Sequence, residues 1–155
     1  MTPTEPLPLH HSWPLADIDQ RFDLGHLFDE QAPGRDGGSV LPRPTGATQG
    51  VWACDLADNG LHWSEEVYRL FGLPRSDPLA RTTAVSLYDE PSRAAMERLR
   101  AHAIRHRRGF TLDVAIVPPG AHRRWVRLIA APICDGARVV RLHGCKTDVS
   151  HLYGR

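Results

Sequence analysis

The chain has 155 residues, of which 41% are hydrophobic and 24% charged, and its formal net charge is +1. These values are ordinary for one globular domain, so they exclude a wholly disordered chain and give no bulk drive toward nucleic acid. Three cysteines without a C-x-x-C pair argue against a disulfide framework and a zinc ribbon. No stretch approaches the roughly 18 apolar residues of a membrane span, and no signal-peptide pattern is present. We therefore expect a cytoplasmic protein without membrane insertion.

Residues 1–49 read as an extension before the folded domain. They carry seven of the thirteen prolines and five of the thirteen glycines, and such a segment buries too little surface to offset its ordering entropy. Leu15, Ile18 and Phe22 recur at helical spacing, which predicts a short amphipathic helix within 15–28. The rest of this extension is expected to be mobile.

The next segment predicts a hairpin followed by a helix. Trp52, Cys54 and Leu56 stand at alternate positions, which predicts a first strand with these side chains facing inward. The Asp58-Asn59-Gly60 sequence is typical of a hairpin turn before a second short strand. Ser64 is a good N-cap, and the helix that it starts is expected to end near Gly72.

The second half predicts one long helix and three strands. The helix is expected to begin at the Asp89-Glu90-Pro91 sequence and to end at Gly109, with Met96, Leu99 and Ala103 forming one apolar stripe. Alternation over 110–116, 126–130 and 138–149 predicts strands. The inward side chains of the first two are Phe110, Leu112, Val114, Ile116, Val126, Leu128 and Ala130.

Four segments together resemble a PAS domain, a sensory α+β module. They are GVWACDL (50–56), GLHWSEEVYRLFGLP (60–74), GFTLDVAIVPPGAHRRWVRLIAAPI (109–133) and RVVRLHGCKTDVS (138–150). The resemblance implies a PAS domain over 50–150, built as a five-stranded antiparallel sheet with short flanking helices and one long helix, and a tail over 151–155. Three positions depart from the family pattern: the Tyr88-Asp89-Glu90-Pro91 run, Cys54 in place of a second Trp, and Asp148-Val149-Ser150 in place of Asp-Ile-Thr.

The resemblance also implies a cavity between the sheet and the long helix, which related proteins fill with haem, flavin or a small metabolite. The sequence does not contain the G-x-N-C-R-F-L-Q run of the photoreactive flavin subgroup, so Cys54 is not expected to support a covalent flavin photocycle. The cofactor is otherwise left open. The side chains expected to line the cavity are Trp52, Cys54, Leu99, His102, Phe110, Leu112 and Leu128.

Two histidines on the long helix admit two interpretations. His102 and His106 are four residues apart and share a face, and haem-binding relatives carry an axial histidine on this helix, so His102 is the candidate ligand. The alternative, which we favour, is that both shield the exposed carbonyls at the end of the helix.

No catalytic set or nucleotide-binding motif emerges, so we expect a protein that works by binding rather than by catalysis. Arginines are frequent along the long helix and at 123, 124 and 127, but without interleaved aromatic residues they favour a solvated face over a nucleic-acid interface.

The outward positions Val117, Trp125 and Ile129 predict an apolar sheet face that needs a cover. The cover could be the N-terminal helix, a second copy of the chain or a different protein.

Only five residues follow 150, and PAS domains commonly pass their signal to an attached output domain through a closing motif, here Asp148 and Val149. We therefore expect regulation in trans by protein–protein contact. From the family's usual partners we expect a sensor histidine kinase or a related two-component protein, with homodimerisation left open. The alternative function is a haem or small-molecule sensor with an occupied cavity.

Overall fold

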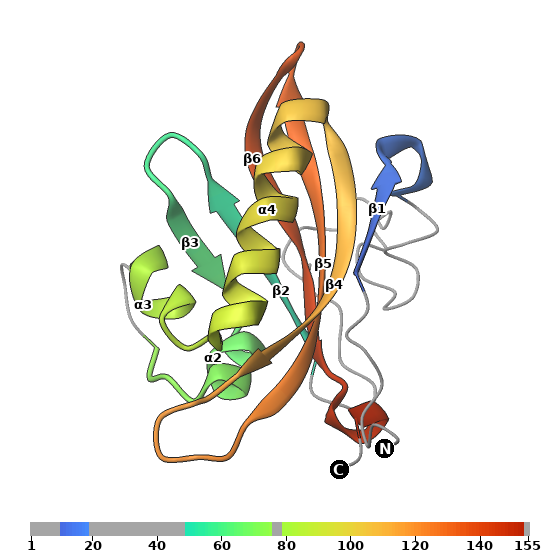
Figure 1. The fold of residues 1–155 in the computed structure, drawn as a ribbon. Helices are drawn as coiled ribbons and strands as arrows, with labels where there is room; N and C mark the ends of the chain where they lie inside the picture. Colours follow the sequence, from blue (N-terminus) through green and yellow to red (C-terminus); the bar gives the residue numbers. More distant parts are fainter. Residues whose placement is uncertain (1–9, 19–48, 76–78, 154–155) are drawn as a thin grey trace, which may run out of the picture.

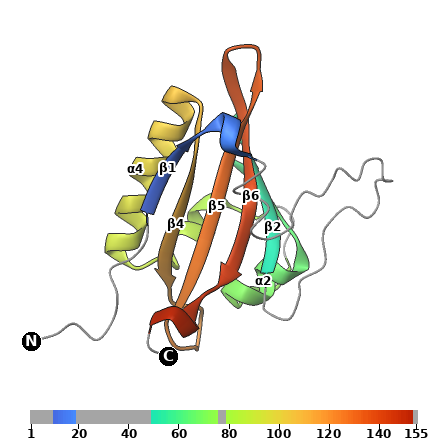
Figure 2. The same ribbon diagram turned by 90° about the vertical axis from the view of Figure 1, so that its right-hand side faces the viewer.

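A computed structural model of the chain describes residues 10–18, 49–75 and 79–153. Its centre is one antiparallel sheet of six strands in the order β1-β4-β5-β6-β2-β3 (Figures 1 and 2). The strands are β1 (His10–Pro14), β2 (Gln49–Asp55), β3 (Gly60–Trp63), β4 (Arg108–Ile116), β5 (Arg124–Asp135) and β6 (Arg138–Asp148). The expected five-stranded sheet is therefore one strand short, because β1 adds to the edge of β4.

The helices lie on one face of this sheet, which we call the helix face (Figure 1). They are α2 (Glu65–Phe71), α3 (Arg81–Val85) and α4 (Glu90–His106). The long helix α4 crosses the sheet, whereas α2 and α3 lie beside β3 (Figure 1). Two short 3-10 turns, η1 (Leu15–Asp17) and η3 (Ser150–Tyr153), pack on the opposite side, the outer face (Figure 2).

The starts of the two expected helices are confirmed. The Asp89 carboxylate accepts a hydrogen bond from the Ser92 backbone N–H at 3.1 Å, which caps α4. Ser64 precedes α2, but its hydroxyl accepts from the Val51 N–H at 3.1 Å and so ties the helix to β2. The expected end of α4 at Gly109 is too late, because the helix stops at His106 and Arg107 takes a positive φ of 57°.

The main core lies between the helix face and the helices. Alternate residues of β4 and β5 point into it, as expected. Their partners from the helices include Val67, Leu70 and Phe71 of α2 and Met96 and Ala103 of α4. This packing closes the domain on one side of the sheet.

Trp13 of β1 covers part of the outer face. Its side chain is fully buried against Ile129, Ala131 and Cys145, and its indole N–H donates to the Thr111 hydroxyl at 3.0 Å. Of the expected helix over 15–28, Leu15–Asp17 form the 3-10 turn η1, Ile18 is helical, and the part from residue 19 lies outside the described residues. Most of the expected mobile extension also lies outside them.

The C-terminal turn η3 covers the neighbouring part of the same face. The Tyr153 ring stacks on Trp125 with centroids 4.3 Å apart and planes inclined by 14°. Its hydroxyl donates to the buried Asp113 carboxylate, which also accepts two hydrogen bonds from Arg127 at 2.8 and 2.9 Å. Both carboxylate oxygens of Asp113 therefore accept hydrogen bonds.

The apolar outer face has a cover at Trp125 and Ile129, and residues of the same chain supply it. Both are buried, at 8% and 3% exposure, because Tyr153 and Trp13 of the same chain lie over them. Val117 at the end of β4 is exposed at 46%, as expected.

We expect Trp13 and Gly109 to be energetically coupled. A Cβ at position 109 would lie 2.2 Å from the Trp13 ring, so Gly109→Ala should destabilise the wild type and cost much less beside Trp13→Ala. Trp13→Ala alone should lower the free energy of unfolding by about 3–5 kcal/mol. Urea denaturation of the two single variants and the double variant measures this, with the exposed His10→Ala as a control. Additive effects of the two substitutions would contradict the close packing.

Candidate ligand-binding cavity around Lys146

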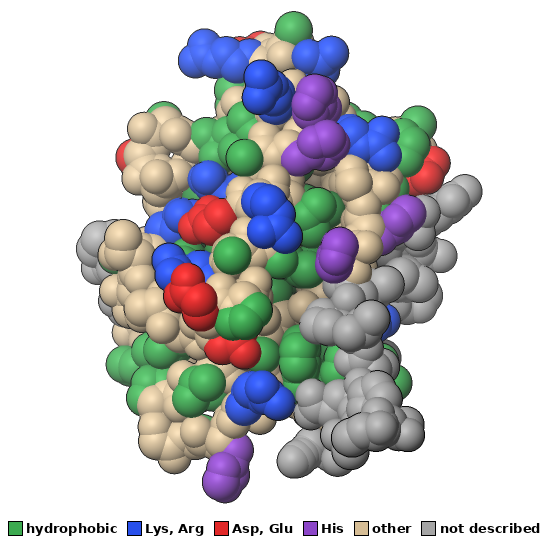
Figure 3. Space-filling view, viewed as in Figure 1, with side chains coloured by type: hydrophobic (Ala, Val, Ile, Leu, Met, Phe, Trp, Pro, Cys, Tyr) green, Lys and Arg blue, Asp and Glu red, His purple; other side chains and the backbone are tan. Residues whose placement is uncertain are grey.

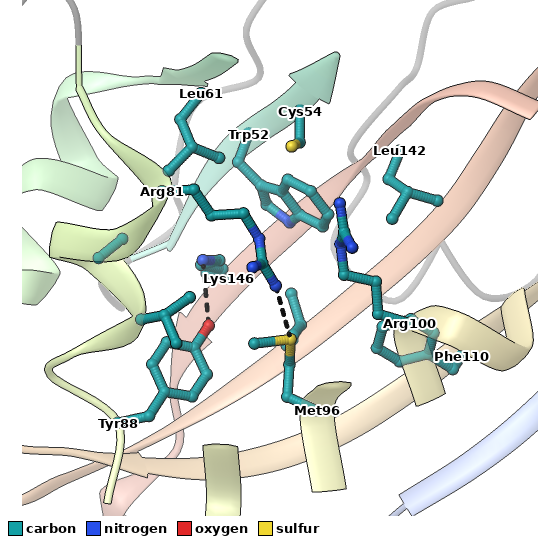
Figure 4. Close-up of a pocket in the computed structure, with 13 residues that line it drawn as sticks. Trp52, Cys54, Leu61, Arg81, Tyr88, Met96, Arg100, Phe110, Leu142 and Lys146 are labelled. Atoms are coloured by element: carbon teal, nitrogen blue, oxygen red, sulfur yellow. Dashed lines mark hydrogen bonds between the residues drawn. The ribbon is translucent and has the colours of Figure 1, made fainter. Parts of the chain in front are cut away.

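A cavity of about 50 Å³ opens between the helix face of the sheet, α3 and α4 (Figure 4). Its walls are mostly apolar and aromatic, but three cationic side chains line it and no Asp or Glu does. The lining residues are Trp52, Cys54, Leu61, Arg81, Ala84, Val85, Tyr88, Met96, Arg100, Phe110, Leu128, Leu142 and Lys146.

Lys146, the only lysine of the chain, is the central feature of the cavity. It is 6% exposed, because its position in β6 alternates with the outward Cys145 and turns its side chain to the helix face. Its Nζ lies 4.7 to 6.0 Å from the centroids of four aromatic rings. These rings belong to Trp52, Trp63, Phe71 and Tyr88. Such contacts favour a cation over a ring face.

Burial lowers the pKa of the Lys146 amine to about 7, with Cys54 acting against this shift and the nearby Arg81 guanidinium adding to it. Among the described residues no carboxylate pairs with this amine. Its polar contact is the Tyr88 hydroxyl at 3.5 Å (Figure 4). Burial raises the pKa of Tyr88, so this phenol stays protonated at neutral pH. Lys146 is therefore divided between its charged and neutral forms near pH 7.

The two arginines of the cavity differ in their partners. The Arg81 guanidinium donates to the Glu97 carboxylate at 2.7 Å and lies 3.9 Å from the Met96 sulfur. Arg100 donates to the Asn59 side-chain oxygen at 3.1 Å, and no carboxylate of the described residues pairs with it. Glu97 therefore compensates Arg81, while the charge of Arg100 and that of protonated Lys146 are left without a counter-charge.

Two buried donors near the amine are also unsatisfied. Within the described part of the chain, the indole N–H groups of Trp52 and Trp63 are buried without an acceptor. A buried polar group without a partner is costly, about 1–3 kcal/mol, and native proteins rarely retain one. Trp52 lines the cavity, and in Figure 4 its indole nitrogen lies on the side of the ring toward Lys146 and Arg81. An acceptor inside the cavity would satisfy it.

The structure brings together four of the seven expected cavity residues: Trp52, Cys54, Phe110 and Leu128. Leu99, His102 and Leu112 do not line the cavity. Leu112 is buried elsewhere in the core, and Leu99 packs at the core's edge. His102 is exposed and its ring lies against that of His106, with centroids 4.5 Å apart.

The arrangement does not fit haem or flavin. His102 points away from the cavity, so the proposed axial ligand is misplaced. Cavities that hold such groups are roughly 300–1,000 Å³, and this one is far smaller. In residues 10–18, 49–75 and 79–153, no group of three or more His, Cys, Asp or Glu side chains could hold a metal ion.

Sequence reasoning missed the polar members of the cavity, which are Arg81, Tyr88, Arg100 and Lys146. One signal was present for Lys146: the alternation that places Leu142 inward also places residue 146 inward.

Several of the described arginines are engaged in contacts within the fold. Arg127 binds the buried Asp113, Arg108 donates to the Ser12 hydroxyl at 2.8 Å, and Arg124 donates to the Leu70 carbonyl. Basic, acidic and histidine side chains are interspersed over the α4 side of the molecule (Figure 3).

The closing residues link β6 to η3. The Asp148 carboxylate accepts from the Ser150 N–H at 2.8 Å, and the Val149 N–H donates to the Trp125 carbonyl at 2.8 Å. Val149 itself is buried beside Trp125 and Tyr153.

Solved structures share this fold. An RNA-binding Light-Oxygen-Voltage receptor matches 68% of this chain and 30% of its own, at 17% identity and a TM-score of 0.60. The N-terminal domain of a diguanylate cyclase with a PAS/PAC sensor from Marinobacter aquaeolei matches 66% of this chain and 96% of its own, at 13% identity and a TM-score of 0.61. The chain has a PAS fold.

A sensory box histidine kinase/response regulator from Burkholderia thailandensis also matches, over 68% of this chain and 80% of its own, at 15% identity and a TM-score of 0.59. The expected fold is thus confirmed. No protein-family model and no curated protein matches the sequence. None of the described helices combines the length and apolar character that crossing a membrane requires.

We expect Lys146→Met to stabilise the protein most at low pH. The folded-state pKa of about 7 lies below the ordinary 10.5, so between these values the unfolded chain binds the extra proton and wild-type stability rises with pH. The stability advantage of the Lys146→Met variant over the wild type should therefore be about 2–3 kcal/mol smaller near pH 9 than near pH 6. Chemical denaturation at both pH values measures it, with Arg138→Met at the exposed start of β6 as the control. A pH-independent difference would show that the amine titrates normally.

Proposed function

We propose that this PAS domain is a non-catalytic sensory module that binds a small monocarboxylate in the Lys146 cavity. The observation that carries the proposal is the pairing of two uncompensated cations, Lys146 and Arg100, with the unsatisfied indole N–H of Trp52 in an otherwise apolar cavity. A carboxylate supplies both the missing charge and the missing acceptor. Because Lys146 is buried, its pairing with a carboxylate is stronger than it would be in water, whereas Arg100 is only half-buried.

The volume of the cavity limits the size of this ligand. A water molecule occupies about 10–15 Å³ on this scale, so the cavity of about 50 Å³ has room for roughly four atoms larger than hydrogen. Acetate has that size. The long side chains of Arg81 and Arg100 reach into the cavity from α3 and α4 (Figure 4), and their rotation would admit a somewhat larger acid.

Binding of an anion should be linked to protonation of Lys146. The anion favours the ammonium form, so it raises the lowered pKa of Lys146 and takes up a proton where the amine was neutral. Affinity is then highest below the free-state pKa of about 7 and falls as the pH rises above it.

We expect acetate to bind and acetamide, its neutral analogue, not to bind. Quenching of tryptophan fluorescence can follow the titration, because Trp52 lines the cavity. Arg100→Met and Lys146→Met should each weaken acetate binding by about tenfold or more, as expected for loss of a charged hydrogen bond. Arg105→Met, an exposed arginine of the same helix, should leave it unchanged. Equal binding of acetate and acetamide would contradict the proposal.

We further propose that the module regulates a signalling protein in trans, a sensor histidine kinase in the first instance. Support comes from the kinase whose solved structure resembles this fold and from the exposed Val117. The Val117 N–H donates to the Leu87 carbonyl at 2.8 Å, next to the cavity residue Tyr88. Trp125 and Ile129 are less suited to a partner contact, because the chain itself covers them.

We expect Val117→Asp to weaken capture of a histidine kinase, or self-association if the partner is a second copy, by at least tenfold. Ile133→Asp is the matched control, since Ile133 is also apolar and exposed, at 38% against 46% for Val117. Light scattering of the purified chain distinguishes dimer from monomer. Equal loss in both variants would remove Val117 from the contact.

A further inference from the structure

We infer that Lys146 is a covalent site, at which its amine forms a reversible imine with a small 2-oxo acid of the size of glyoxylate. The inference deepens the proposed function and rests on it, because the same cavity holds the carboxylate. It adds a chemical class to the ligand: an acid that carries a carbonyl group next to its carboxylate.

The first support is the placement of the amine. Nζ lines the cavity, while the aromatic rings around it exclude water and hold no acceptor other than the Tyr88 hydroxyl. A lysine becomes a nucleophile when burial and neighbouring cations keep part of it unprotonated. The titratable and charged groups that line the cavity are Cys54 from β2, Arg81 from α3, Tyr88 before α4 and Arg100 from α4. None is a carboxylate, and although the aromatic ring faces and Cys54 favour the ammonium form, burial outweighs them and keeps part of the amine neutral.

The second support is a proton carrier beside the amine. In the reaction, the Nζ lone pair forms a bond to the carbonyl carbon and the C=O electron pair moves to oxygen. The resulting carbinolamine then loses its hydroxyl group as water, and a C=N bond replaces the C–O bond. The Tyr88 hydroxyl, 3.5 Å from Nζ, can donate a proton to the departing oxygen and recover one from the nitrogen. The sum is amine plus oxo acid giving imine plus water, without any oxidant or reductant.

The third support is the balance of size and charge in the product. Glyoxylate leaves four atoms other than hydrogen on Nζ after it loses water, which matches the room for roughly four such atoms estimated above. Its carboxylate needs a cation and a donor within the cavity, and Arg100 and the Trp52 indole N–H supply them. A protonated imine and a carboxylate together carry no net charge, which suits a site where burial disfavours an isolated ion.

The composition of the chain makes this inference easy to test. Lys146 is its only lysine, so the α-amino group at the N-terminus is the one other primary amine. The full chain is incubated with glyoxylate and sodium cyanoborohydride, which reduces imines to stable amines, and analysed by intact mass and peptide mapping. We expect one carboxymethyl group, located on Lys146. Excess acetate should suppress it, because acetate occupies the same cavity without a carbonyl.

Three variants sharpen the outcome. Lys146→Arg should remove the label, Tyr88→Phe should slow labelling about tenfold through loss of the proton carrier, and the exposed Arg105→Met should label like the wild type. Because Tyr88→Phe removes only a hydroxyl group, its labelling rate stays informative if Lys146→Arg fails to fold.

The possible results separate this inference from the proposed function. Acetate binding without a label on Lys146 overturns the imine and leaves the sensory proposal standing. Loss of both acetate binding and labelling overturns both. Labelling confined to the N-terminus, or equal labelling of Lys146 by glyoxylate and by the neutral aldehyde propanal, overturns the assignment to 2-oxo acids.

Discussion

The amine of Lys146 constrains the interior of this domain more than any other described group. It is buried without a counter-ion, and removing an ammonium group from water is expensive unless other groups compensate. The compensation comes from ring faces at 4.7 to 6.0 Å, each worth about 0.5–2 kcal/mol to a cation. Those rings come from β2, β3, α2 and the segment before α4, so four separate parts of the chain meet around one side chain.

Close to Lys146, the backbones of β5 and β6 approach each other closely. Two residues earlier on β6, a Cβ at Gly144 would lie 1.7 Å from the Ile129 carbonyl oxygen, so only glycine lets β5 and β6 approach as they do. The same β5 residue, Ile129, lies under Trp13 on the outer face. Neighbouring residues of β5 and β6 therefore contribute to both faces of the sheet. The cationic cavity lies on one face, and Trp13 covers the other.

The sequence predicts the local elements well, because the alternation in 110–116 and 126–130 and the caps at Ser64 and Asp89 are local signals. It does not predict β1, since His10–Pro14 contains a proline and few strand-forming residues and is held as a strand by its pairing with β4. That pairing joins residues about 100 positions apart, such as His10 and Leu112, and no local pattern encodes it.

The cavity residues likewise divide into those that a local pattern predicts and those that depend on tertiary packing. Alternation places Trp52, Cys54, Phe110 and Leu128 correctly, but the rotation of α4 about its axis is set by packing. Arg100 lies about 40° around the helix from Met96, whereas His102 lies about 120° away, since each residue advances by about 100°. A choice of Leu99 as the centre of the inward stripe therefore gave His102 in place of Arg100. Lys146 was missed because a lysine in a strand usually faces water, and only the three-dimensional packing of the rings reverses that preference.

The Lys146 cavity lies close to the place where β4 ends and α4 begins. Tyr88, which contacts Lys146, forms an isolated bridge with Ile116. The next residue, Asp89, donates its N–H to the Ala115 carbonyl at 2.9 Å and also caps α4. Lys146 thus contacts the residue that joins the start of α4 to the end of β4, one residue before the exposed Val117.

A second connection runs along β6 itself, from Lys146 to Asp148, whose carboxylate holds the start of η3. The turn that follows places Tyr153 on Trp125 and against Asp113, so the C-terminal cover of the outer face begins only two residues from the buried amine. A ligand shifts such an arrangement only by the difference in its affinity for two states. In this domain that difference would arise at an unpaired cation, where adding or removing one negative charge has its largest effect because the surroundings are apolar.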